Sequence, residues 1–166
     1  MRSPHNVVFS ALDLKCVDAA HWVCAYFLCV YHACIIMLQR SRLAKTSEES
    51  SLRSVTAFSK TMDAARSITY LANLFLRDNC QFHHVCPFLC FFLFEAGVAW
   101  MNISRLENDP MTHSLCDQGI VILIRSLEKI ATYFITAESL HDSLKKMRAA
   151  RSYVQVIYIL EVFSRK

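Results

Sequence analysis

Five side chains that could bind a metal lie close together in the middle of the chain. Cys80, His83, His84, Cys86 and Cys90 fall within eleven residues. Thiolate and neutral imidazole groups are ligands that zinc prefers. The spacings of two, one and three intervening residues match no common zinc module, and Cys86 and Cys90 fall on an apolar helical stretch. We therefore predict a loop followed by buried thiols and no metal site, with Cys80, His83, His84 and Cys86 as weak candidates.

Glu95 is the most unusual charge in the sequence, because it stands inside the apolar run FFLFEAGV. A buried carboxylate needs a partner or a raised pKa. The interpretation we favour is that Glu95 pairs with an Arg or His of a neighbouring helix. The alternative is a regulatory pocket for a small-molecule effector, with His32, Glu95 and Trp100 as its residues. His21 and His32 cannot share a metal, because an unbroken helix separates them by about 16 Å.

Other side chains give little indication of catalysis. No Ser, Cys or Thr stands in a sharp Gly-flanked turn of the kind that presents a nucleophile. We therefore predict no enzyme, and no cofactor is implied. The sequence contains two small basic groups, and the second could bind phosphate or act as a nuclear import signal, although a solvated helix face is the interpretation we favour. These groups are Arg40, Arg42 and Lys45, and Lys145, Lys146, Arg148 and Arg151.

Hydrophobic periodicity predicts that long helices position these side chains. The chain has 166 residues, of which 54% are hydrophobic and only 2 are Gly and 3 Pro. So few turn-forming residues argue against sandwiches, barrels and Gly-rich phosphate loops. We predict one all-α domain over 1–166, an irregular bundle of about five long helices, with 1–15 loosely ordered. The predicted helices are 18–41, capped by Asp18; 50–77; 87–106, starting at Pro87; 113–135; and 137–163, capped by Thr136.

Two of the predicted helices are almost wholly apolar, which leaves a choice between a protein core and a membrane. The run from Ala19 to Leu38 contains no Asp, Glu, Lys or Arg, and Glu95 is the only such residue from Asn79 to Ile103. The other three helices are amphipathic. We expect them to enclose the two apolar helices in a water-soluble bundle. The alternative is a small membrane protein with spans near 19–38 and 85–104.

Cysteine usage and charge restrict the compartment and the partners. Most of the 8 Cys lie in or beside apolar stretches, where a free thiol behaves as a small hydrophobic group. The N-terminus does not read as a signal peptide, so we predict a reducing compartment. A net charge of +4 is below the basic bias expected of a nucleic-acid-binding surface.

The segment YHACIIMLQR, Tyr31 to Arg40, resembles a helix of the fungal-specific transcription factor domain. This domain is the middle homology region of zinc binuclear cluster regulators, where a Tyr-His pair leads an aliphatic run to an Arg. The elements that follow are similar in order: a polar loop, a helix containing AARSI, a Pro-led aromatic helix and a further helix. The resemblance covers roughly residues 10–135 and corresponds to the C-terminal part of that domain.

Two features depart from the family pattern. Ser41 follows Arg40 where the family usually has Pro, and the chain contains no C-x2-C pair of a DNA-binding zinc cluster. The resemblance implies a regulatory or interaction domain in the nucleus that takes part in transcription regulation without binding DNA directly. Part of the domain being absent, we also expect exposed apolar surface, and hence a protein partner or self-association.

Overall fold

The computed structural model describes residues 19–43, 51–77, 86–107 and 109–164, with side chains described over 23–40, 55–77, 86–107 and 109–151. This part of the chain is all helical and contains no strand. Its helices are α2 (Ala19–Leu43), α3 (Ser51–Arg77), α4 (Leu89–Leu106), α5 (Pro110–Ala131) and α6 (Ile135–Ser164). The predicted all-α bundle of five long helices is therefore confirmed. The predicted lead-in over 1–15 and the Asp18 cap lie outside the described residues.

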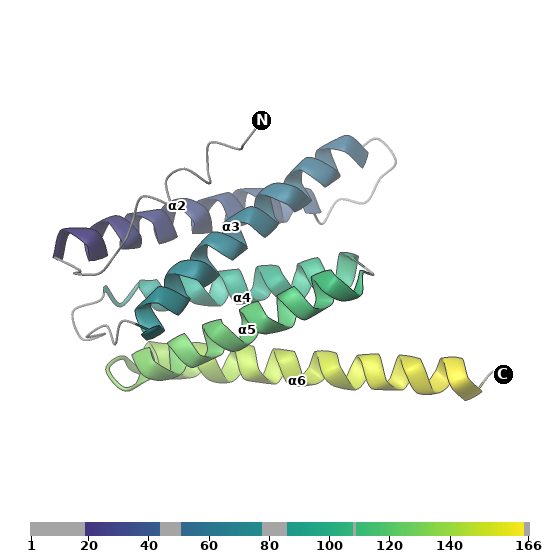
Figure 1. The fold of residues 1–166 in the computed structure, drawn as a ribbon. Helices are drawn as coiled ribbons and strands as arrows, with labels where there is room; N and C mark the ends of the chain where they lie inside the picture. The colour runs from purple at the N-terminus through teal and green to yellow at the C-terminus, as the bar shows by residue number, and fades with distance from the viewer. Residues whose placement is uncertain (1–18, 44–50, 78–85, 108, 165–166) are drawn as a thin grey trace.

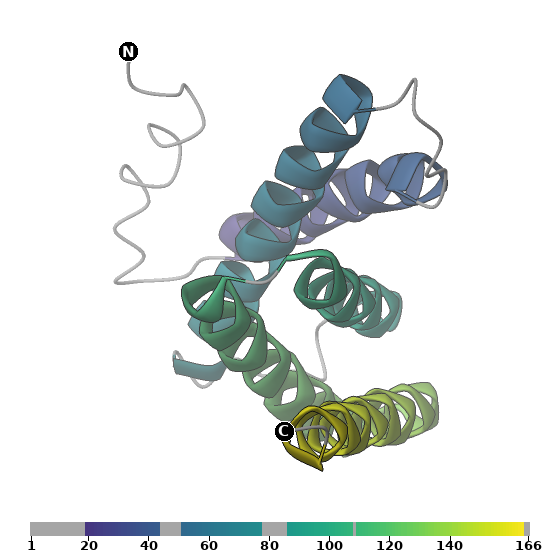
Figure 2. The same ribbon diagram turned by 90° about the vertical axis from the view of Figure 1, so that its right-hand side faces the viewer.

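The helix α4 lies at the centre of the bundle and contacts all four other helices. The helix α2 lies along one side, where it contacts α3 and α4 only, while α5 and α6 pack on the other side of α4 (Figure 1). The view along the bundle shows α3 crossing between the α2 side and α5 (Figure 2). Among the described residues α4 contributes more to the buried core than any other helix, with side chains that include Leu93, Trp100 and Ile103.

Both glycines lie where two helices approach closely. A Cβ atom on Gly97 of α4 would lie 2.7 Å from Leu144 Cδ1 of α6. A Cβ atom on Gly119 of α5 would lie 2.6 Å from Trp100 Nε1 of α4. The position of each glycine thus has a structural reason, since the missing Cβ allows a neighbouring side chain to pack directly against a helix backbone.

The ends of three helices differ from the prediction. The helix predicted to start at Pro87 begins at Leu89, because Pro87 and Phe88 form a turn before α4. We predicted that the fourth helix spans 113–135, but α5 begins at Pro110 and ends at Ala131. The carboxylate of Asp109 accepts hydrogen bonds from the backbone N–H and the hydroxyl of Thr112, both at 2.8 Å, so Asp109 is the N-cap. The predicted Thr136 cap is wrong, because α6 begins at Ile135 and Thr136 lies in its first turn.

The two apolar helices differ in how far the bundle covers them. Their most apolar windows, Val23–Arg40 and Leu89–Leu106, are long enough to cross a membrane by length and composition, and 28% and 56% of their residues are buried. The expectation that amphipathic helices enclose both is therefore wrong for α2. Large side chains remain exposed along it, namely Val23 (54%), Phe27 (63%), Tyr31 (54%), Met37 (60%) and Leu38 (70%). Among the described helices α2 contacts α3 and α4 alone, and these large side chains on its surface stay exposed.

Candidate functional site

The exposed side of α2 forms a continuous apolar surface. Cys24, Phe27, Tyr31, Cys34 and Leu38 are all exposed, and they follow each other at alternating steps of three and four residues. This spacing places them in one row along a helix, as in the contact seam of a coiled coil. We call this row the α2 stripe. The opposite side of α2 is buried in the bundle, where Cys29, Ala33 and Ile36 contribute to the core. The stripe carries no charge and can pack against another apolar surface.

A cavity of about 260 Å³ opens between α2, α3 and α4. Its apolar lining comes from Ile36 of α2 and from Val98, Ala99 and Leu106 of α4. Thr61 of α3 also borders it. We call this cavity the α2–α4 cleft. Its charged and amide side chains are Arg40, Glu95, Asn102 and Arg105.

Glu95 and Arg40 form an ion pair across the cleft. Arg40 Nη1 lies 3.6 Å from Glu95 Oε2, with 60% of the Arg40 side chain and 24% of the Glu95 side chain exposed. The prediction that Glu95 pairs with a cation of a neighbouring helix is confirmed. The oxygen Oε2 is itself buried and accepts no hydrogen bond from the described residues. One end of the cleft therefore holds an ion pair whose two charges offset each other and whose buried carboxylate oxygen lacks a hydrogen-bond donor among the described residues.

Of the three predicted pocket residues, Glu95 alone lines the α2–α4 cleft, whereas His32 and Trp100 are not among its lining residues. His32 is buried on α2, and its ring meets the edge of the Tyr31 ring with centroids 5.2 Å apart. Trp100 is buried in the core, where its Nε1–H donates a hydrogen bond of 2.9 Å to Thr69 Oγ1. Sequence reasoning did not single out Asn102 or Arg105 as cleft residues.

Of the weak metal candidates, only Cys86 lies within the described residues, and Cys80, His83 and His84 lie outside them. The Cys86 thiol donates a hydrogen bond of 3.4 Å to the Tyr26 hydroxyl. This contact, together with burial and the nearby thiols, raises the pKa of Tyr26 to about 12. In the described part of the chain, no three His, Cys, Asp or Glu side chains come together as metal ligands would.

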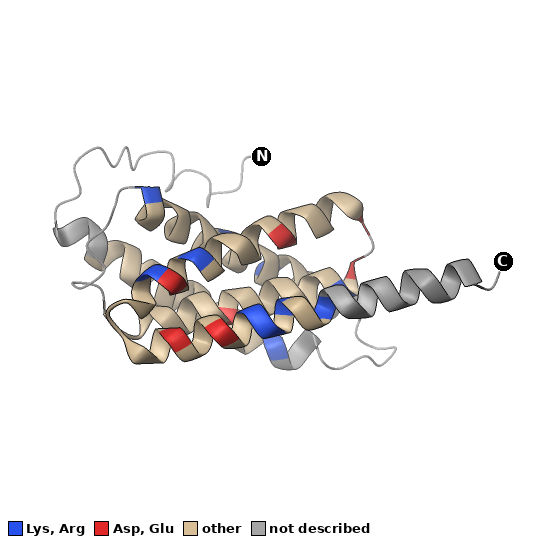
Figure 3. Cartoon of the chain, turned by 90° about the horizontal axis from the view of Figure 1, so that it is seen from below, with Lys and Arg blue, Asp and Glu red and all other residues tan. Residues whose placement is uncertain are grey.

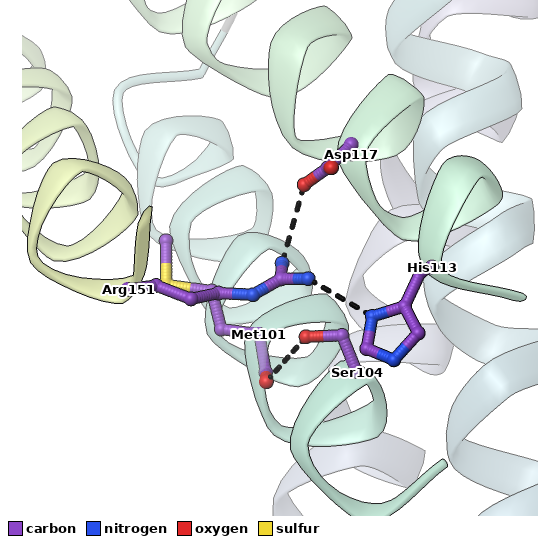
Figure 4. A network of polar contacts seen from close by, with 5 residues as sticks. All are labelled: Met101, Ser104, His113, Asp117 and Arg151. Atoms are coloured by element: carbon purple, nitrogen blue, oxygen red, sulfur yellow. Dashed lines mark hydrogen bonds and ion pairs between the residues drawn. The ribbon is translucent and has the colours of Figure 1, made fainter. Parts of the chain in front are cut away.

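Arg151 has a structural role that differs from the predicted solvated face. Its side chain is only 7% exposed, and Nη1 donates to Asp117 Oδ1 at 3.2 Å. Its Nη2 lies 3.3 Å from Nδ1 of His113, so the guanidinium joins α6 to two residues of α5 (Figure 4). On α4 nearby, the Ser104 hydroxyl donates to the Met101 carbonyl.

The other basic residues of the two predicted groups, where the structure describes them, do not form a surface of positive charge alone. Lys145 and Lys146 are exposed. Acidic side chains stand near the start of α6 and basic ones further along it (Figure 3). Arg40 is paired with Glu95, while the side chains of Arg42 and Lys45 lie outside the described residues.

Comparison with known proteins adds no relative. The chain matches no protein family, no curated protein and no solved structure. The resemblance to the fungal transcription factor domain therefore stays a prediction from the sequence.

Proposed function

We propose that this chain is a helical regulatory and interaction domain that pairs with a second copy of itself through the α2 stripe and carries out no chemistry. The observation that supports the proposal most directly is the exposure of Phe27, Tyr31 and Leu38 at coiled-coil spacing. Apolar patches of this kind are uncommon on soluble monomers and typically mark contact surfaces. Two copies of the uncharged α2 stripe can pack against each other about a two-fold axis, because no like charges would meet at the contact.

The size of the surface supports the same proposal. The exposed parts of Phe27, Tyr31 and Leu38 amount to roughly 350 Å², given whole side-chain areas of about 150–250 Å² for aromatic residues. A stable interface of standard size covers about 800 Å² per partner. Cys24 and Cys34 add to this area because both are exposed. The α2 stripe therefore provides about half of the area that a dimer interface of standard size requires.

The biological setting of the proposal comes from the sequence resemblance. A domain of this type would act in the nucleus as part of transcription regulation, and it would rely on a partner for contact with DNA. The described residues form no purely basic surface of the kind that binds DNA phosphates, which is compatible with leaving the DNA contact to a partner. Self-association would then determine how many copies of this chain are present in one regulatory complex.

Sedimentation equilibrium over a range of concentrations tests the proposal. We expect the unmodified chain to reach a dimer and Phe27→Glu to remain a monomer, because a charge in the centre of the stripe would be buried without a partner. Met111→Glu is the matched control, because Met111 is 80% exposed on α5 and lies outside the stripe. A monomeric unmodified chain at roughly 100 μM would contradict the proposal, and so would equal dissociation constants for the two variants.

The membrane alternative has a specific observation in its favour, which is the same uncovered apolar helix. The 25-residue α2 is long enough to cross a hydrocarbon layer of about 30 Å. Two observations argue against α4 as a second membrane span. The other helices pack around α4, and it contains the buried Ser104 and the partly buried Glu95. Under our proposal the expressed chain stays in the supernatant after high-speed centrifugation without detergent. Recovery only in a carbonate-resistant membrane pellet would support the alternative.

A further inference from the structure

The α2–α4 cleft has apolar walls and charged groups placed towards two ends. Val98, Ala99 and Leu106 line it from α4, and Ile36 lines it from α2. A volume of about 260 Å³ corresponds to roughly nine water molecules at about 30 Å³ each, and therefore to a ligand of about ten non-hydrogen atoms. This is slightly smaller than the usual range for ligand cavities, which starts near 300 Å³.

The charges of the cleft differ in how they are balanced. Glu95 and Arg40 offset each other through their ion pair. Arg105 also lines the cleft, and none of the ion pairs found in the described residues includes it. The cleft therefore has a net charge of one positive unit, and this charge is located on Arg105. Asn102 lies one helical turn before Arg105 on α4 and adds an amide that can donate hydrogen bonds.

The Glu95 carboxylate does not prevent an anion from binding near Arg105. Ten residues of helix separate the two positions, which corresponds to about 15 Å along the axis of α4. At that separation, and with Arg40 offsetting the charge of Glu95, only a weak repulsion acts on an anion at Arg105. A molecule with a negative head near Arg105 can therefore extend its apolar part along Val98 and Ala99 towards Ile36.

We infer that the α2–α4 cleft binds a small monocarboxylate with an apolar chain of about eight carbons, whose carboxylate is held by Arg105 and Asn102. This inference goes beyond the proposed function and does not depend on it, since none of the α2 stripe residues lines the cleft. A guanidinium can hold a carboxylate with two parallel hydrogen bonds, whereas an alcohol would accept only one and an ammonium would be repelled.

Calorimetric titration of the full chain with octanoate tests the inference. We expect about one equivalent to bind with a dissociation constant on the order of 10⁻⁴ M, as befits a ligand of this size. Octan-1-ol and octylamine have the same chain without the carboxylate, and each should bind at least tenfold more weakly. Failure of octanoate to bind up to about 10 mM would overturn the inference, as would equal binding of the three probes.

Variants locate the binding in the cleft. Arg105→Gln should weaken octanoate binding about tenfold or more, because it removes a charge-assisted contact. Arg125→Gln is the matched control, since Arg125 is exposed on α5 outside the cleft, and it should bind octanoate unchanged. Val98→Phe should also weaken binding by filling the cleft.

The same titration on Phe27→Glu separates the cleft from the α2 stripe. Retained octanoate binding in this variant is expected, whether or not the chain forms dimers. Loss of binding in Phe27→Glu together with normal binding in Arg105→Gln would place the ligand on the stripe and overturn the inference.

Discussion

Trp100 packs so closely against Gly119 that a single added methyl group should destabilise the bundle. A Cβ atom at position 119 would lie 2.6 Å from Trp100 Nε1 and 2.9 Å from Cε2. The indole would have to move, and it is held by the hydrogen bond of 2.9 Å to Thr69 Oγ1. Thr69 in turn donates to the carbonyl of Ala65, so α3 restricts the movement.

The expected magnitude follows from three opposing contributions to the free energy of unfolding. Replacing Gly by Ala inside a helix normally stabilises it by about 1 kcal/mol. Overpacking a core costs about 1–3 kcal/mol. A buried indole N–H left without its acceptor costs a further ~1–3 kcal/mol. Gly119→Ala should therefore lower the free energy of unfolding by about 1–5 kcal/mol, which reverses the usual sign of this substitution.

Urea unfolding followed by far-ultraviolet circular dichroism measures the effect, with all proteins at one concentration because dimerisation adds to apparent stability. Gly97→Ala is the matched control. Its Cβ would meet Leu144 Cδ1 and Cδ2 at 2.7 and 2.8 Å, which are the ends of a flexible aliphatic side chain that no hydrogen bond holds in place. We expect this variant to remain within about 1 kcal/mol of the unmodified chain. A Gly119→Ala variant as stable as the unmodified chain would refute the packing described for Trp100.

Three further predictions concern polar contacts. Asp117→Ala should lower the free energy of unfolding by about 1–3 kcal/mol, because it leaves the buried Arg151 without its carboxylate partner. Arg151→Met removes the buried charge as well and should cost less than about 1 kcal/mol. If urea unfolding shows the larger loss for Arg151→Met, the described burial of Arg151 is contradicted. Thr69→Val should lower the unfolding free energy by about 1–2 kcal/mol through the lost acceptor for Trp100, and an unchanged transition midpoint would argue against that hydrogen bond. Hydrogen bonds from Thr112 lower the pKa of the Asp109 carboxyl in the folded chain. The stabilisation from this cap is therefore complete above the ordinary carboxyl pKa of about 3.9 and is lost as the pH falls through the lower pKa of the folded chain. Asp109→Asn should lose less stability than the unmodified chain between pH 6 and 2, and parallel acid-unfolding curves for the two proteins would contradict this.

Much of the fold could be predicted from the sequence, because helix periodicity and end signals are local. The steps of three and four through Phe58, Met62, Ala65 and Ile68 define the inward side of α3, and the structure places it there. The start of α5 was misplaced because Asp109 and Pro110 are compatible with both a turn and a helix N-terminus. Only the hydrogen bonds from Thr112 decide between the two.

The candidate site was harder to predict because it depends on which side of α2 the bundle covers. Cys24, Phe27 and Tyr31 show coiled-coil spacing in the sequence, but α2 is apolar on nearly every side, so no side could be identified as exposed. Arg151 was misassigned for a related reason. It stands among Lys145, Lys146 and Arg148 in the sequence, and only the approach of Asp117 from α5 reveals that it is buried.

The most direct test of the account is the alkylation rate of Cys24 and Cys34, followed by mass spectrometry as a function of chain concentration. Both thiols lie in the exposed α2 stripe, whereas Cys29 is buried and burial raises its pKa to about 12. We predict that Cys24 and Cys34 react rapidly in dilute solution and slow down as dimers form, that Phe27→Glu keeps them reactive at every concentration, and that Cys29 stays unmodified throughout. Rates for Cys24 and Cys34 that do not change with concentration while the chain dimerises would contradict the assignment of the stripe as the interface.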